Sequence, residues 1–346
     1  MAGTAGRAEN SPIPRATTVV CGQEITEDIT LDGDLVCENG PALIIAADNV
    51  TLDMAGFTVS GKGPAAANGP GILFRDVQGA TVQNGTVARF GAGVAITGGS
   101  GNVVQHLTVA DNVGTPDGDF GDGIVITDSS ANRIQANTVL RNGPYSGISL
   151  VDAATANVIC ENVVTDNNML PGDPRAARQT MGIRVEGPGA NGNRITANTV
   201  TGSGADGIVV LGTCAHPDTG CVGSPPNEQN VIIANTSHEN GTSGRGCGIR
   251  LFAVPPSVVP AHNTIADNVA DDNTTHGVSI DAGGAANPGP PENTVTANRG
   301  HGNGEFDGFD ANTTPACGTN TWSANDFGTV NQPCVAAGAP GLRPPA

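Results

Sequence analysis

Residues 132–139 read NRIQANTV, and the pattern Asn-x-Ile-x-x-Asn-x-Val returns along the chain. Further copies begin at Asn157, Asn193, Asn230, Asn263 and Asn293, and looser ones at Ala80, Asn102 and Asn320. Each copy holds two short alternating stretches that suit strands and are too short for a helix. One such unit cannot bury its apolar face alone, so we expect the units to stack.

A second motif, Gly-[IV]-x-[ILV], lies between these copies. It begins at Gly71, Gly93, Gly123, Gly147, Gly182, Gly207, Gly248 and Gly277. Its uneven spacing indicates a core unit of about 22 residues with inserted loops. In a stack, each strand pairs with the same strand of the next unit, about 4.8 Å away. The sequence therefore predicts an all-β fold, a parallel β-helix of about ten coils. Strict hexapeptides are absent, which favours the right-handed form.

The second Asn of each repeat is expected at a tight turn. There it either adopts the left-handed αL conformation or bonds neighbouring backbone groups. Stacking would align these residues in a ladder along the solenoid. We interpret them as scaffold rather than as binding residues.

The composition excludes several classes of protein. The 346 residues include 50 Gly but only 3% aromatics, and the net charge is -18. Gly has no period of three, which excludes collagen, and 38% apolar residues argue against global disorder. No basic stripe exists for a nucleic acid or an anionic membrane surface, and no apolar run is long enough to span a bilayer. We expect a monomer.

The cysteines indicate an oxidising compartment. Three closely spaced pairs read as disulfides: Cys21 with Cys37, Cys214 with Cys221, and Cys317 with Cys334. The first and last would staple the two ends of the solenoid, while Cys160 and Cys247 are expected to be buried thiols. The cysteine pairs favour a secreted protein, but the first residues lack the apolar core of a signal peptide. We therefore expect a secreted protein whose export segment is absent from this sequence. Residues 1–17 and 336–346 are predicted to be disordered tails around a β-helix over 18–335.

Several segments resemble a known group of proteins. They are CGQEI (21–25), VTLDMAGFTVSG (50–61), the Asn-x-Ile-x-x-Asn-x-Val coils and the end CGTNTW…FGTVNQPC. Together they resemble bacterial secreted right-handed β-helix proteins of the pectin-lyase-like superfamily. The resemblance covers about residues 18 to 335. It implies a fold more than an activity, because that superfamily includes lyases, hydrolases, epimerases, esterases and non-catalytic adhesins.

Long loops wall the face formed by the Gly-[IV]-x-[ILV] strands. They are predicted at residues 111–121, 165–181, 212–228, 253–262 and 282–292, and long loops on one face of a rigid scaffold usually mark its functional site. Because side chains alternate along a strand, the second and fourth residues after each Gly should point outward there. In a stack, the residues at each of these positions form a row across the coils. The rows, together with the residues just before each Gly, supply the candidate catalytic residues Arg184, Asp206, Arg250 and His276. The candidate substrate-binding residues are Asp122, Tyr145, Ser149, Glu186, Phe252, Ser279 and Asp281.

The expected register brings these groups near one another. Arg184 and Arg250 share one row and are two coils apart. Asp206 and His276 share another row and are also two coils apart. In each pair the two Cα atoms should be about 9 to 10 Å apart. Arg184 should reach toward Asp206, and Arg250 toward His276. The alternative is that both Arg residues simply pair with nearby acids such as Glu186 and Asp206.

Two Arg beside a His suit β-elimination at a uronic acid residue of a polysaccharide. Arg would neutralise the sugar carboxylate, His276 would take the proton, and Tyr145 would donate to the leaving oxygen. This is the leading prediction.

Two other functions stay open. The acidic chain suits a neutral glycan better, and hydrolysis would then use Asp122, Asp206 or other carboxylates. DGI at Asp122 and Asp206, and HGVSI at His276, resemble strands of polygalacturonase-like hydrolases, although Asp206 and His276 are two coils apart here. A non-catalytic glycan-binding or surface β-helix is the third function. No cofactor is predicted, although the oxygen-rich loop 111–122 could hold Ca²⁺.

Overall fold

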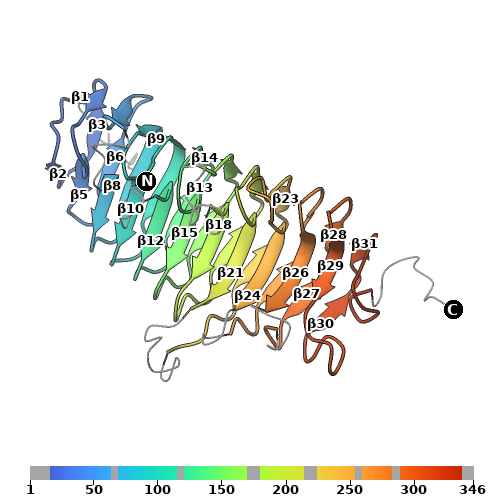
Figure 1. Ribbon diagram of the computed structural model, residues 1–346. Helices are drawn as coiled ribbons and strands as arrows, with labels where there is room; N and C mark the ends of the chain where they lie inside the picture. The colour runs from blue at the N-terminus through green and yellow to red at the C-terminus, as the bar shows by residue number, and fades with distance from the viewer. Residues whose placement is uncertain are drawn as a thin grey trace, which may run out of the picture.

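The computed structural model describes residues 16–63, 69–114, 121–169, 180–213, 224–253, 259–282 and 289–336. In these ranges the chain is all-β and winds into one elongated stack of coils, with the N-terminal coils at one end and the C-terminal coils at the other (Figure 1). All strand pairs between successive coils are parallel, so the predicted parallel β-helix is confirmed. No helix that could cross a membrane occurs in these ranges.

The Gly-[IV]-x-[ILV] motifs build one sheet, here called the Gly-Ile sheet, with one strand from each of 11 coils. Its strands are β2 (Gln23–Ile25), β5 (Leu43–Ile45), β8 (Pro70–Arg75), β10 (Ala92–Thr97), β12 (Ile124–Thr127), β15 (Ile148–Val151), β18 (Ile183–Glu186), β21 (Ile208–Gly212), β24 (Ile249–Ala253), β26 (His276–Ala282) and β29 (Phe306–Asp310).

The Asn-x-Ile-x-x-Asn-x-Val motifs build the rest of each coil as two short strands. They belong to an 18-stranded sheet and a 2-stranded sheet. The larger contains β1 (Ala16–Thr17), β3 (Ile29–Leu31), β4 (Leu35–Val36), β6 (Thr51–Asp53), β7 (Thr58–Ser60), β9 (Thr81–Ala88), β11 (Val103–Ala110), β13 (Arg133–Gln135), β14 (Thr138–Leu140), β16 (Val158–Cys160), β17 (Val163–Thr165), β19 (Arg194–Thr196), β20 (Thr199–Thr201), β22 (Val231–Ile233), β23 (Thr236–His238), β25 (Thr264–Ala266), β27 (Thr294–Thr296) and β30 (Thr321–Ser323), and the smaller contains β28 (Arg299–Gly300) and β31 (Asp326–Phe327).

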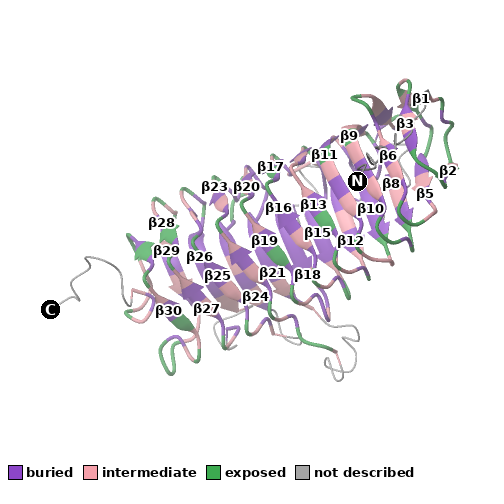
Figure 2. Ribbon diagram, turned by 180° about the vertical axis from the view of Figure 1, so that it is seen from behind, coloured by how far each residue is buried: buried purple, intermediate pink, exposed green. Residues whose placement is uncertain are grey.

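The core runs along the inside of the stack. The aliphatic residues of each motif point inward and are fully buried, as Ile183, Val185, Ile195 and Val200 show for one coil. The ribbon in Figure 2 accordingly carries buried stripes along every coil. Because each coil buries its aliphatic side chains against those of its neighbours, the stack and not the single coil is the stable unit.

Stacked Asn residues hold the corners between strands. The second Asn of each repeat donates its side-chain amide to the side-chain oxygen of the equivalent Asn in the next coil, over Asn137, Asn162, Asn198, Asn235, Asn268, Asn298 and Asn325. The first Asn of each repeat forms a parallel ladder, as from Asn157 to Asn193. The αL conformation falls on the residue before, such as Ala197 (φ 55°), so the ladder Asn uses the second expected option and bonds its neighbours.

A disulfide lies near each end of the stack. Cys21–Cys37 is in the first coils and Cys317–Cys334 in the last, as predicted, and Cys160 and Cys247 are buried free thiols. The predicted pair Cys214–Cys221, residues 1–15 and residues 337–346 lie outside the described residues.

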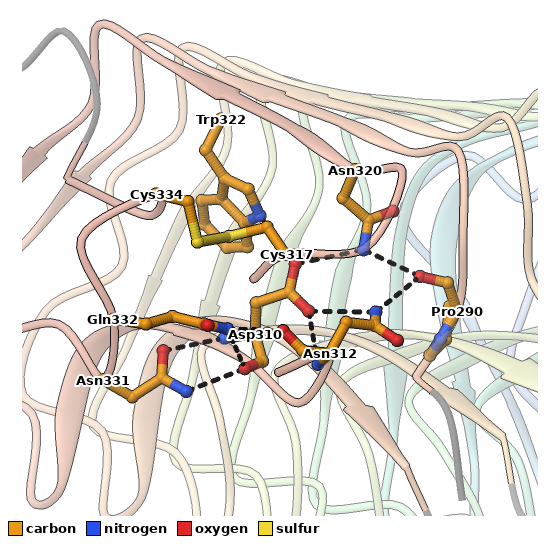
Figure 3. Close-up of a disulfide and its surroundings, with 9 residues drawn as sticks. All are labelled: Pro290, Asp310, Asn312, Cys317, Asn320, Trp322, Asn331, Gln332 and Cys334. Carbon is orange, nitrogen blue, oxygen red and sulfur yellow. Dashed lines mark hydrogen bonds between the residues drawn. A yellow bond between two sulfur atoms is a disulfide. The ribbon is translucent and has the colours of Figure 1, made fainter. Parts of the chain in front are cut away.

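A buried carboxylate completes the C-terminal end. Asp310 lies beneath the Cys317–Cys334 disulfide, where its carboxylate accepts hydrogen bonds from Trp322 Nε1 (2.8 Å), Asn320 Nδ2 (3.0 Å) and Asn312, both backbone and side chain (Figure 3). Burial raises the pKa of Asp310, and these hydrogen bonds partly offset that shift. The carboxylate joins the last coil to the segment that closes it.

We expect Asp310→Asn to loosen this end selectively. The carboxylate of Asp310 has two acceptor oxygens, whereas an amide has only one. The NH₂ group of the new Asn side chain would therefore face other hydrogen-bond donors, and this should lower the stability of the C-terminal end by about 2 kcal/mol. Trp322 is the only Trp in the chain, so its fluorescence reports on this end directly. The fluorescence transition of the variant should shift to lower temperature than the transition of the whole stack seen by circular dichroism. Equal shifts of the two signals would contradict this role.

Candidate functional site

The outer surface of the Gly-Ile sheet gathers the predicted polar residues in register. Arg184 pairs with Val209, and Val209 with Arg250, so the two Arg residues share one row with one strand between them. Glu186, Leu211, Phe252 and Asp281 form the next row toward the strand ends. The predicted register is therefore confirmed, and each of these residues sits on a rigid strand.

Arg184 lies between two carboxylates. Its Nη1 is 2.7 Å from Glu186, its Nη2 is 3.7 Å from Asp122, and it also donates to Ser149 Oγ. Ser149 in turn donates to Asp122 (2.5 Å), and the Tyr145 ring lies 5.6 Å from the guanidinium. We call these residues the Arg184 cluster. Arg184, Asp122 and Ser149 are buried, Tyr145 is half-buried, and the Glu186 side chain is 23% exposed.

Arg250, two coils further on, also lies between two carboxylates. Its Nη1 is 3.4 Å from Asp206 and its Nη2 is 2.5 Å from Asp281, while its guanidinium lies 3.7 Å from the centre of the Phe252 ring. Burial alone would lower the pKa of Arg250, but the two carboxylates raise it above its ordinary value. We call these residues the Arg250 cluster. Asp281, like Glu186, is 23% exposed, whereas Asp206 is buried.

The inner carboxylate of each cluster also supports the stack. Asp122 accepts a hydrogen bond from the backbone N–H of Ser146 (2.9 Å), and Asp206 accepts one from Cys247 (2.7 Å). These bonds tie one coil to the next, as the Asn ladders do. Glu186 and Asp281 are the carboxylates that solvent reaches.

Cys247 fills the corner between Asp206 and His276. Burial raises the pKa of its thiol to about 12, and the Asp206 carboxylate acts in the same direction. Ser279 Oγ is 3.5 Å from the sulfur. A thiol this hard to ionise is a structural group and no nucleophile at neutral pH.

His276 is packed into the sheet rather than directed toward solvent. The residue is 4% exposed, its ring stacks on Phe309 (4.4 Å between centroids), and its Nε2 is 3.7 Å from Glu305. Its Nδ1 is buried and has no hydrogen-bond partner. Burial lowers the pKa of His276, and although Glu305 and Asp281 oppose this effect, the net shift is downward.

This environment predicts acid sensitivity. Because its pKa is lower in the folded state, His276 binds fewer protons there than in the unfolded chain, so stability falls as pH drops below about 6.5. His276→Phe keeps an aromatic ring on Phe309 and removes the proton site. The melting temperature of the variant should therefore fall less between pH 7 and pH 5 than that of the natural protein. His262→Gln, at an exposed position, is the control and should leave the pH dependence of the melting temperature unchanged. If the melting temperature of His276→Phe fell with pH as steeply as that of the natural protein, the prediction would be refuted.

The structure joins some predicted partners and separates others. Both Arg residues pair with acids, which was the alternative expectation, and Asp206 pairs with Arg250 rather than with Arg184. An apolar cluster lies between the two sites, formed by Met181, Ala205 and Val209 with Leu211 and Phe252 against it. The candidate site is thus two adjacent ion clusters and no single constellation.

Some residues of the site were missed by the sequence reasoning. Glu305, Phe306 and Phe309 surround His276 from β29 and the turn before it. A further, weaker copy of the Gly-[IV]-x-[ILV] motif, GFDA at Gly308, marks this strand in the sequence. The middle parts of the predicted loops, and residues 115–120 of the predicted calcium loop, lie outside the described residues. Within the described ranges, no group of three His, Cys, Asp or Glu side chains could hold a metal ion.

This chain is similar to a known protein family in sequence and to solved proteins in structure. The sequence model of the right-handed β-helix region family matches residues 43–221, about half of the chain. This chain is a member of the right-handed β-helix family. The match confirms the right hand of the coil, and together with the solved structures described next it supports the pectin-lyase-like fold. No curated protein sequence matches this β-helix protein significantly.

Solved structures share the fold at low sequence identity. A mutant of the periplasmic alginate epimerase AlgG is 13% identical, with a TM-score of 0.52 over 89% of this chain and 74% of that one. Pectate lyase Pel9A is 14% identical, with a TM-score of 0.51 over 86% and 70%. The Dettilon tailspike protein is 17% identical, with a TM-score of 0.50, and the β-helix protein spans only 60% of its length. At these identities the likeness concerns the fold.

Proposed function

We propose that this β-helix protein is an extracellular carbohydrate-active enzyme that cleaves a neutral polysaccharide hydrolytically on the Gly-Ile sheet, at the Arg250 cluster. One observation carries the proposal: Asp206 and Asp281 contact two nitrogens of one guanidinium. These two contacts set an upper limit of about 8 Å on the distance between the two carboxylates, which is compatible with the spacing of the carboxyl pairs of glycosidases. The similar folds of AlgG and Pel9A, an epimerase and a lyase by name, support a polysaccharide as the substrate class.

The exposed row gives the polysaccharide a place to lie. Leu211 and Phe252, both half-buried, stand between Glu186 and Asp281 in register on neighbouring strands. Apolar side chains suit the faces of sugar rings, and carboxylates accept hydrogen bonds from sugar hydroxyls. A chain lying along the solenoid axis would meet both kinds of contact at steps of one coil, about 4.8 Å.

The roles within the Arg250 cluster follow from exposure. Asp281 is the carboxylate that reaches the glycosidic oxygen or the attacking water. Asp206 is the second carboxylate of the pair, fixed by the Cys247 N–H. Arg250, held by both and stacked on Phe252, keeps the pair in position.

This assignment reverses the order expected from sequence. In β-elimination an Arg must receive the carboxylate of the sugar, but both Arg residues already hold two carboxylates each. Each cluster, counted as one guanidinium and two carboxylates, carries a net negative charge that disfavours an anionic sugar. The imidazole of His276, whose pKa is lowered by burial, keeps β-elimination as the second candidate, although its Nδ1 is buried.

A panel of polysaccharides tests the proposal. Neutral glucans, galactans, mannans and xylans are incubated beside polygalacturonate and alginate, and both reducing ends and the ultraviolet absorbance of unsaturated uronides are measured. Hydrolysis releases reducing ends without that absorbance. Absorbance from a uronan would favour the second candidate, and silence of both signals across the panel would leave a non-catalytic glycan-binding protein.

A further inference from the structure

Glu186 and Asp281 are the partly exposed carboxylates of the two clusters, Glu186 on the same strand as Arg184 and Asp281 on the strand next to that of Arg250. Each is the fourth residue after its motif Gly, each is 23% exposed, and each contacts the Arg of its own cluster at close range, at 2.7 Å and 2.5 Å. The inner carboxylates, Asp122 and Asp206, lie farther from the guanidinium nitrogens, at 3.7 Å and 3.4 Å, and are buried. The partly exposed pair therefore occupies Nη1 of Arg184 and Nη2 of Arg250, and the buried pair lies by the other Nη of each guanidinium.

These are the donors that a sugar carboxylate would need. Arg binds carboxylates through its guanidinium N–H groups with charge-assisted hydrogen bonds. Arg184 Nη1 and Arg250 Nη2 already donate such bonds within the chain. An incoming uronate would have to displace a protein carboxylate and would add a further negative charge to a cluster that is already negative.

We propose that Glu186 and Asp281 determine the specificity of the site by rejecting anionic sugars. They act by occupying the Arg donors that would otherwise bind a uronate. This inference rests on the proposed function for its biological meaning, since it specifies which glycans that site refuses. It follows that removal of either carboxylate uncovers an anion-binding guanidinium in the same place.

Affinity electrophoresis tests this inference with Glu186→Gln and Asp281→Asn. Mobility of the natural protein and of both variants is measured in gels that contain polygalacturonate, alginate or neutral polysaccharides. Glu239→Gln is the matched control, because it removes one carboxylate from an exposed position outside both clusters and changes the net charge equally. Circular dichroism and Trp322 fluorescence establish that each variant is folded.

We expect the natural protein and Glu239→Gln to ignore both uronans. Glu186→Gln and Asp281→Asn should each bind a uronan about tenfold more tightly or better, since one uncovered charge-assisted contact is worth about that factor. The gain should disappear at 1 M salt, where charges are screened within about 3 Å. Uronan binding by the natural protein that equals its binding of neutral glycans would overturn the inference, and so would folded variants that behave like Glu239→Gln.

The same gels separate this inference from the proposed function. If the natural protein binds no glycan and the two variants still gain uronan binding, the specificity inference stands and the proposed function fails. If the natural protein binds neutral glycans and the variants gain nothing, the proposed function stands and the inference fails.

Discussion

Asn198→Ala should lower the free energy of unfolding by about 3 kcal/mol or more. The Asn198 side chain donates to Ile159 O (2.9 Å) and Asn235 Oδ1 (2.9 Å) and accepts from the backbone and side chain of Asn162, both at 3.0 Å. Alanine removes all four bonds and leaves the buried backbone N–H of Asn162 without its acceptor, while Asn235 Oδ1 keeps the backbone N–H of residue 198 and Asn162 Nδ2 keeps Ile134 O. An unsatisfied buried group costs about 1 to 3 kcal/mol, and the lost bonds add to that cost. Thermal unfolding followed by circular dichroism measures the effect.

Thr199→Ala is the matched control for the ladder. Thr199 follows Asn198 directly, but its side chain points outward from β20 and is half-buried. Its removal should change stability by about 0.5 kcal/mol or less. If Asn198→Ala proved as mild as Thr199→Ala, the ladder would not be the element that holds the corners.

Asp281→Asn should abolish most of the hydrolytic activity that the panel detects. The amide keeps the size of the side chain but cannot transfer a proton as the carboxyl group does, so kcat should fall by about 10²- to 10⁴-fold. KM for a neutral polysaccharide should change little, because Phe252 and Leu211 remain in place. Steady-state kinetics on the polysaccharide identified by the panel supply both constants.

Asp271→Asn provides a demanding control for that result. Asp271 is also a carboxylate paired with an Arg, Arg299, but the pair lies outside the Gly-Ile sheet. Its loss should leave kcat unchanged. Equal losses in the two variants would mean that the Asp281 effect is one of stability, and full activity in Asp281→Asn would remove Asp281 from the chemistry.

Much of the fold can be predicted from the sequence because the same buried and corner residues recur in each repeat. An aliphatic residue such as Ile195 and a corner Asn such as Asn198 recur in each coil, so one coil predicts the next. A third Asn ladder, which includes Asn142 and Asn167, was not predicted. Its signal was present as an Asn five residues after the second Asn of the repeat.

The site was predictable only in part. The strand register placed Arg184 and Arg250 correctly in one row, because register depends on the repeat alone. Which carboxylate pairs with which Arg depends on how far side chains reach across coils. Here Asp206 pairs with Arg250, and Asp122 pairs with Arg184. Burial of His276 depends on Phe309 from the next coil, whose motif is the most divergent.

Hydrogen exchange with and without a bound neutral polysaccharide would show directly whether the glycan binds to the Gly-Ile sheet. The Asp281→Asn variant would be used, so that the glycan persists during labelling. If the glycan lies on the Gly-Ile sheet, exchange should slow in β18, β21, β24 and β26 and should not change in β13, β16, β19 and β22, which form another face of the coil. Protection confined to that other face, or protection absent in the presence of a glycan known to bind, would contradict this placement of the glycan.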